Sequence, residues 1–260
     1  MPFVMRGGVS ISYFVEGDGP TIVKIPGLGA DLKMSLLIGW NKLIPQHRFV
    51  YIDPRGHGES GRPIDRSAHS MEEYREDVRA VLDAHGVERA VFWGVSDGAE
   101  VACAFADAYP HRVAAIIDYD GWDDRDLCES PIKEGRLELS DRVRKMGWPA
   151  LIGAVVQADG YSLESPLVKE FQTANPEMVM LELEEWTRWK GPVSILPRLS
   201  FPILRLLNGK READEVDRIK KAAGPSTEMH IIRDASHMQV CIEPRRSVDL
   251  VRNFLSRLDL

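Results

Sequence analysis

Residues Gly94–Gly98 read Gly-Val-Ser-Asp-Gly, a G-x-S-x-G pattern centred on Ser96. The pattern lies between a short apolar run, 91–95, and a stretch of small residues with helical character, 97–108. A strand that passes into a helix through so tight a turn strains the serine backbone, and flanking glycines allow this because they lack a β-carbon. The turn lifts the hydroxyl of Ser96 out of the sheet and predicts a nucleophile. A glycine-rich turn of a nucleotide-binding fold would give the same pattern, so other segments must decide.

Short apolar runs alternate with amphipathic stretches in the first half of the chain, which favours a mostly parallel sheet covered by helices on both faces. This alternation of strands and helices stops from about 121 to 200, where a charged segment carries four of the six tryptophans and has helical character in pieces. We therefore predict one domain over 1–260 with a helical lid inserted at about 121–200. The expected strands are 9–15, 21–25, 49–52, 91–95, 113–117, 201–207 and 229–232, and the expected helices are 70–84, 97–108, 214–222 and 245–258.

Composition narrows the range of partners. The 260 residues carry a formal charge of −7, and basic residues alternate with acidic ones, so no nucleic-acid partner is expected. Neither a signal-peptide pattern nor an apolar stretch of about 18 residues is present, so we expect a cytoplasmic protein that does not bind membranes. Three cysteines without C-x-x-C spacing predict free thiols: Cys103, Cys128 and Cys241. No metal, flavin or nicotinamide motif is present, so no cofactor is expected.

Two more glycine-containing segments directly follow expected strands: Pro26–Gly29, and Asp53–Ser60 with the sequence Asp-Pro-Arg-Gly-His-Gly-Glu-Ser. With these segments the sequence resembles the α/β-hydrolase family, whose members commonly show a His-Gly turn after the third strand, D-x-R-G-x-G-x-S after the fourth, G-x-S-x-G after the fifth and a histidine near the C-terminus. The resemblance runs from about Val9 to Val95 and onward to Phe254, leaving only the lid uncovered. It implies an α/β-hydrolase fold with a mostly parallel eight-stranded sheet.

The resemblance places the family's histidine on His237, which follows the last expected strand. A serine hydroxyl is a weak nucleophile until a base with a pKa near 7 takes its proton. Of the seven histidines, His237 is the one in a strand-end loop behind Ser96 in the right order. His57 lies in the Arg-Gly-His-Gly turn, where the family uses it structurally. We therefore predict that His237 is the general base.

The acid that completes such a triad has two candidate positions. The family usually places it after the strand that follows the lid: counting from Gly209 gives Glu212, whereas counting from Pro202 gives Arg211. Some branches, including certain haloalkane dehalogenases and the zearalenone lactonases, place it after the strand behind the nucleophile helix, at the distance from the nucleophile where Asp120 stands. Glu212 could equally be part of the acidic start of a helix, and Asp120 an ordinary loop carboxylate. We favour Asp120 and keep Glu212 as the alternative acid.

The resemblance also implies an oxyanion hole built from the backbone amides of Leu28 and Asp97. Here the sequence departs from the family, because Pro26 replaces the usual histidine before the glycine. The Gly-Leu-Gly sequence of this loop resembles the corresponding loop in the lactonase branch of the family. The side chain of Asp97 could bind a substrate amine, but we favour an acidic residue stabilised by the helix dipole.

These residues predict a cofactor-free serine hydrolase that forms an acyl-enzyme on Ser96. A carboxylic ester or a lactone is the first expected substrate. Hydrolysis of a carbon-carbon bond in a diketone uses the same triad and stays an alternative, as does a non-catalytic ligand-binding protein of this fold. Haloalkane dehalogenation is disfavoured, because it requires an aspartate where Ser96 stands.

The expected partner is a small-molecule substrate. Three tryptophans of the predicted lid suit a pocket for an apolar or ring-containing group: Trp122, Trp186 and Trp189. They could equally pack the lid onto the core, and the sequence does not separate these uses. It also leaves a homodimer open.

Overall fold

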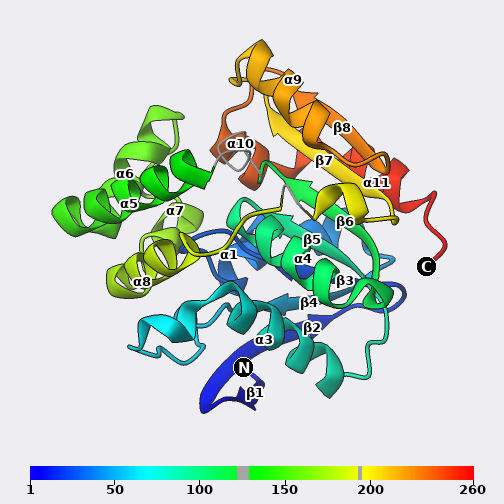
Figure 1. The fold of residues 1–260 in the computed structure, drawn as a ribbon, viewed down its shortest axis with the longest axis horizontal. Helices are drawn as coiled ribbons and strands as arrows, with labels where there is room; N and C mark the ends of the chain where they lie inside the picture. The colour runs from blue at the N-terminus through cyan, green and yellow to red at the C-terminus, as the bar shows by residue number, and fades with distance from the viewer. Residues whose placement is uncertain (122–128, 193–194) are drawn as a thin grey trace.

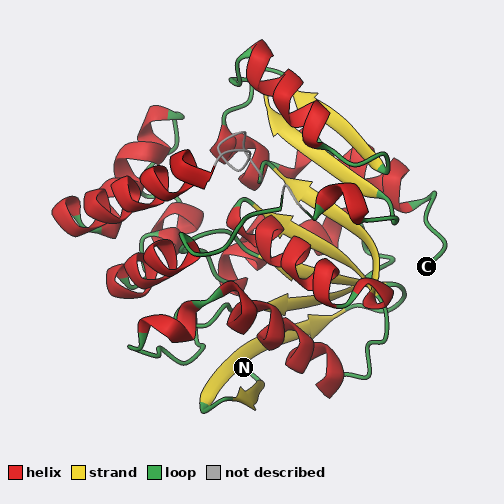
Figure 2. Cartoon of the chain, viewed as in Figure 1, coloured by secondary structure: helices red, strands yellow, loops and turns green. Residues whose placement is uncertain are grey.

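The computed structural model describes residues 1–121, 129–192 and 195–260. Its centre is an eight-stranded sheet with the strand order β1-β2-β4-β3-β5-β6-β7-β8. Strand β2 pairs antiparallel with β1 and β4, and the remaining neighbours are parallel. The expected fold class is confirmed (Figures 1 and 2). The strands are β1 (Phe3–Arg6), β2 (Val9–Glu16), β3 (Thr21–Ile25), β4 (Arg48–Ile52), β5 (Ala90–Val95), β6 (Val113–Tyr119), β7 (Ile203–Asn208) and β8 (Thr227–Ile232).

Strand β1 is the one strand that the sequence pattern did not reveal. It forms a hairpin with β2 through Gly7 and Gly8, both of which have a positive φ. Its large apolar residues Phe3 and Met5 are exposed, so the strand lacks the buried apolar face from which a strand is recognised. The other strands agree with the expected ones to within a few residues.

Helices cover both faces of the sheet and create two separate cores. On one face α3 (Met71–Ala84) and α4 (Asp97–Ala108) pack on a core that includes Val23 of β3. On the other face α1 (Leu32–Ile38), α2 (Trp40–Leu43) and α11 (Val248–Leu255) pack on a core that includes Ile22. Neighbouring residues of β3 thus face opposite cores, as the two-residue period of a strand requires. Helix α9 (Ala213–Ala222) follows β7, and α10 (His237–Ile242) follows β8.

The described residues between β6 and β7 form four α-helices, which we call the inserted helices: α5 (Glu129–Met146), α6 (Trp148–Ala158), α7 (Pro166–Phe171) and α8 (Pro176–Trp186). Figure 1 shows them grouped to the left of the sheet, where α7 contacts α1. Buried polar contacts attach α8 to the rest of the chain: Glu182 accepts a hydrogen bond of 2.9 Å from the Tyr74 hydroxyl and lies 2.7 Å from His57 Nε2. The single-domain boundary and the lid role of this segment stay predictions.

Two further observations concern the described residues. None of their helices is both long and apolar enough to cross a membrane. Cys103 and Cys241 are buried thiols, whereas Cys128 lies outside the described residues. The location in the cell that the sequence suggests stays a prediction.

Candidate active site

Ser96 occupies a strained turn between β5 and α4. Its φ of 50° and ψ of −123° lie in a region that residues with a β-carbon rarely adopt. The two glycines of the pattern are required by space. A β-carbon on Gly94 would lie 2.3 Å from Cα of Ala99, and one on Gly98 would lie 2.4 Å from the carbonyl oxygen of Ile25. Close packing of β5, α4 and β3 therefore holds the serine in this conformation.

Asp120 directly follows β6, and His237 is the first residue of α10. Asp120 has a positive φ of 54°, and its amide donates a 2.9 Å hydrogen bond to the Leu206 carbonyl on β7. A capping box between Ser236 and Gln239 fixes the start of α10. These two turns place His237 Nδ1 2.7 Å from Asp120 Oδ2. The structure thus joins the predicted base to the favoured acid.

The Asp120 carboxylate is completely buried and accepts several hydrogen bonds besides the contact with His237. Asn208 donates to it twice, from the backbone amide to Oδ1 at 3.0 Å and from Nδ2 to Oδ2 at 2.7 Å. Arg211 donates to Oδ1 from Nε and from Nη2, each at 3.2 Å. Burial raises the pKa of Asp120, but the bond to His237 and the charge of Arg211 outweigh it, so the net pKa lies below its ordinary value. Asp120 is therefore ionised at neutral pH.

Glu212, the alternative acid, lies elsewhere. It is the exposed N-cap residue of α9, and within the described parts of the chain no hydrogen bond or ion pair joins it to His237. Its neighbour Arg211 points instead to Asp120. This arrangement favours Asp120 as the acid, and the catalytic assignment itself stays a proposal.

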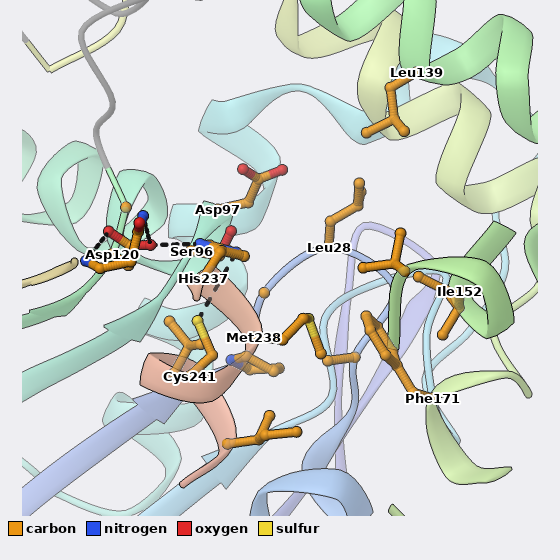
Figure 3. A pocket seen from close by; sticks show the side chains of 18 of the residues that line it. Leu28, Ser96, Asp97, Asp120, Leu139, Ile152, Phe171, His237, Met238 and Cys241 are labelled. Atoms are coloured by element: carbon orange, nitrogen blue, oxygen red, sulfur yellow. Dashed lines mark hydrogen bonds and ion pairs between the residues drawn. The ribbon is translucent and has the colours of Figure 1, made fainter. Parts of the chain in front are cut away.

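The second ring nitrogen of His237 faces the cavity wall. Nε2 lies 3.8 Å from the sulfur of Cys241, one helical turn further along α10. The described residues contain no hydrogen bond between the Ser96 hydroxyl and His237, although both side chains border the same cavity (Figure 3). Burial lowers the pKa of His237, but the Cys241 sulfur and the Asp120 carboxylate raise it to a net value well above the ordinary one. The exposed fraction of the ring is 44%, so water screens part of this effect.

The two predicted oxyanion amides lie at the ends of neighbouring strands. Leu28 follows β3 and Asp97 is the first residue of α4, and neither amide donates a hydrogen bond to a described residue. The Asp97 carboxylate accepts a 3.2 Å hydrogen bond from Arg136, whose other nitrogen lies 2.7 Å from Glu100. The charge of Asp97 is thus already paired with a cation, which does not support the idea that it binds a substrate amine.

A cavity of about 600 Å³ connects these residues. Figure 3 shows Ser96, Asp120 and His237 at one end, and apolar side chains from the sheet loops and the inserted helices at the other. The apolar end includes Leu28, Leu139, Ile152, Phe171 and Met238. The cavity therefore has a polar end that can react and an apolar end that can bind a hydrocarbon or ring.

Of the three predicted substrate-binding tryptophans, the two that the structure describes do not border this cavity. Trp186 is buried against the core, donating a 2.9 Å hydrogen bond to the His69 carbonyl, and Trp189 packs beside the same core. Trp122 lies outside the described residues. Among the described tryptophans, Trp148 at the start of α6 lines the cavity, and it also packs on Gly29. The sequence pattern could not tell a tryptophan that lines the cavity from one that packs on the core, because all four tryptophans of the predicted lid are in the same charged segment.

Comparison with known proteins identifies the family to which the chain belongs. The profile of the alpha/beta hydrolase fold matches residues 20–171, more than half of the chain. The chain belongs to the alpha/beta hydrolase fold family. A curated relative, RutD of Azorhizobium caulinodans, named as a carbamate hydrolase, is 31% identical over 126 residues. That match covers 47% of this chain and 45% of the relative, so the chain spans less than half the length of that protein.

Solved structures of the same fold cover nearly the whole chain. A thermophilic esterase from Thermogutta terrifontis superposes with a TM-score of 0.81 and 24% identity, covering 98% of this chain and 96% of the esterase. The enol-lactonase from Burkholderia xenovorans LB400 gives a TM-score of 0.79 with 21% identity, covering 98% of this chain and 100% of the lactonase. At these identities the likeness establishes the fold.

Proposed function

We propose that the protein is a serine hydrolase that cleaves a carboxylic ester or a lactone. The observation that carries this proposal is the placement of Ser96, on a strained turn, beside the same cavity as the hydrogen-bonded pair of His237 and Asp120. The names of an esterase and an enol-lactonase among the proteins of similar fold are consistent with it. Apart from the substrate and a water molecule, the proposed reaction uses groups of the chain itself: Ser96, His237 and Asp120.

In the proposed reaction, Ser96 Oγ attacks the substrate carbonyl while His237 Nε2 takes its proton. The proton on Nδ1 stays in the hydrogen bond to Asp120 Oδ2, which holds the tautomer and stabilises the imidazolium. The backbone amides of Leu28 and Asp97 stabilise the oxyanion, together with the N-terminus of α4. His237 then protonates the leaving alcohol, and a water that it activates releases the acid from the acyl-enzyme.

The cavity indicates the kind of substrate. Its apolar end suits an aliphatic chain or a ring, and its reacting end is small and polar. We therefore infer a neutral ester or lactone with one apolar group of medium size.

The experiment is hydrolysis of p-nitrophenyl esters of increasing chain length and of small and macrocyclic lactones, by the wild type and by Ser96→Ala. We expect turnover by the wild type and its loss in Ser96→Ala. A fluorophosphonate probe should label the wild type once, at Ser96. No turnover and no labelling would contradict the proposal and favour a ligand-binding protein, whereas labelling without ester turnover would favour carbon-carbon bond hydrolysis.

A further inference from the structure

Arg211 lies between β7 and α9, at one of the two positions where counting along the family pattern would place the acid. We propose that Arg211 is a positioning residue: it anchors the Asp120 carboxylate through Oδ1 and limits how strongly that carboxylate stabilises the charged form of His237. The inference rests on the proposed function in that it assigns His237 the role of base. The contacts that it uses are independent of any substrate.

The two oxygens of Asp120 have different charged partners. Nε and Nη2 of Arg211 both lie 3.2 Å from Oδ1, whereas Nδ1 of His237 lies 2.7 Å from Oδ2. The carboxylate is fully buried and the side chain of Arg211 is 7% exposed. Between these two buried groups the guanidinium charge is poorly screened and acts on the whole carboxylate, and through the carboxylate on the partly exposed imidazole.

Arg211 is itself held from its far side. Its Nη1 pairs with Glu215 in the first turn of α9, so the guanidinium lies between two carboxylates. Asn208 completes the shell by donating to both oxygens of Asp120. Asp120 needs such a shell, because its φ of 54° is a conformation that persists only when its surroundings hold it.

The consequence concerns the proton affinity of His237. A buried carboxylate beside an imidazole favours the imidazolium, and a base that stays protonated at neutral pH cannot accept the serine proton. The arginine charge offsets part of this effect. The other charged or titratable groups around the pair come from several elements: Lys24 of β3, Asp97 of α4, Asp118 of β6 with its ion-pair partner Arg205 of β7, Glu215 of α9 and Cys241 of α10.

The test is an NMR titration of the His237 imidazole in the wild type and in Arg211→Met. We expect the titration midpoint of His237 to rise by about half a pH unit to one pH unit when the guanidinium is removed. Arg211→Lys keeps the charge and should leave the midpoint near that of the wild type. Arg218→Met is the matched control, because Arg218 pairs with Asp214 on the exposed side of α9. It removes one arginine from α9, the helix that directly follows Arg211, and should cause no shift.

Arg211→Gln provides a second neutral variant that keeps a hydrogen-bond donor, should Arg211→Met not fold. A midpoint that stays constant or falls in the neutral variants would overturn the inference. With an ester substrate, the same variants should lower kcat about tenfold with little change in KM, and should move the acidic limb of kcat/KM upward. If the wild type hydrolyses nothing, the proposed function fails, while the titration still decides the effect of Arg211.

Discussion

Asp120 and Glu212 are the two carboxylates that the sequence offered as the acid, and their surroundings predict opposite results on substitution. Asp120→Asn keeps the size of the side chain but removes the charge, and allows His237 to adopt the wrong tautomer. We expect kcat to fall about 10³- to 10⁴-fold. Glu212→Gln, the matched control on an exposed N-cap, should change kcat less than twofold. Steady-state hydrolysis of one good ester distinguishes them, and the reverse order of effects would assign the acid to the loop after β7.

The protonation of His237 predicts how activity depends on pH. The base must be neutral to accept the serine proton, and its pKa is raised by Cys241 and Asp120 beyond the lowering caused by burial. Activity should therefore be low where the imidazole is charged and should increase as the pH rises through the folded-state pKa. We expect the midpoint of this limb in kcat/KM, for a neutral ester, to lie above about 6.5, the ordinary value for histidine. A midpoint below that value would contradict the assigned environment.

Among single residues, the sequence predicted those whose spacing is diagnostic of the family. It did not predict the contacts that other side chains make with His237 and Asp120. Ser96 is recognisable because two glycines must flank it, and His237 because it follows the last strand. Asn208, Arg211 and Cys241 carry no motif. Their contacts with the pair depend on how β7 and α10 pack beside β6, which one sequence does not show.

The junction between β5 and α4 is the element on which the nucleophile depends. A methyl group on Gly98 would overlap the carbonyl oxygen of Ile25 at 2.4 Å, and that backbone atom belongs to a central strand that cannot move aside. We expect Gly98→Ala to lower the free energy of unfolding by about 3 kcal/mol, because the overlap strains the helix against the sheet. Urea denaturation followed by circular dichroism measures this loss.

The matched control for that loss is Gly153→Ala, in the interior of α6. A β-carbon there would meet the ends of two side chains, Gln172 Nε2 at 3.3 Å and Leu163 Cδ2 at 3.5 Å. These can shift, and alanine favours a helix, so the stability should change by less than about 1 kcal/mol. Equal losses in Gly98→Ala and Gly153→Ala would mean that the tight junction is not what makes Gly98 necessary.

The elements themselves were largely predictable. Buried parallel strands appear as short apolar runs, and helices such as α3 show their apolar face at the expected spacing behind the N-cap Ser70. Strand β1 and the short helices α1, α2 and α10 were not expected. Strand β1 exposes its apolar side chains, and α10 has six residues, too few for a periodic pattern, although its capping box at Ser236 is a signal that could have revealed it.

On the scale of the whole molecule, the cavity exists only because two parts of the chain meet. Leu28 and Met238 come from loops and helices next to the sheet, whereas Ile152 and Phe171 come from the inserted helices. Gly29 permits this approach, because a β-carbon there would lie 2.3 Å from the ring of Trp148. In the proposed function, the choice of substrate would therefore depend on how the inserted helices pack against the sheet as well as on the reactive residues.

Because the cavity has separate apolar and reacting ends, we predict that a substitution at the apolar end changes the preference for acyl-chain length without impairing the reaction itself. Ile152 is 5% exposed and borders the apolar end of the cavity. Ile152→Trp should fill this end, so we expect kcat/KM for an octanoate ester to fall about tenfold or more while the acetate ester changes little. Leu137→Trp is the matched control, because Leu137 on α5 is 47% exposed and does not border the cavity. An equal loss on both esters in Ile152→Trp would show that the acyl chain binds elsewhere, and a shift in Leu137→Trp would point to a change in the inserted helices as a whole.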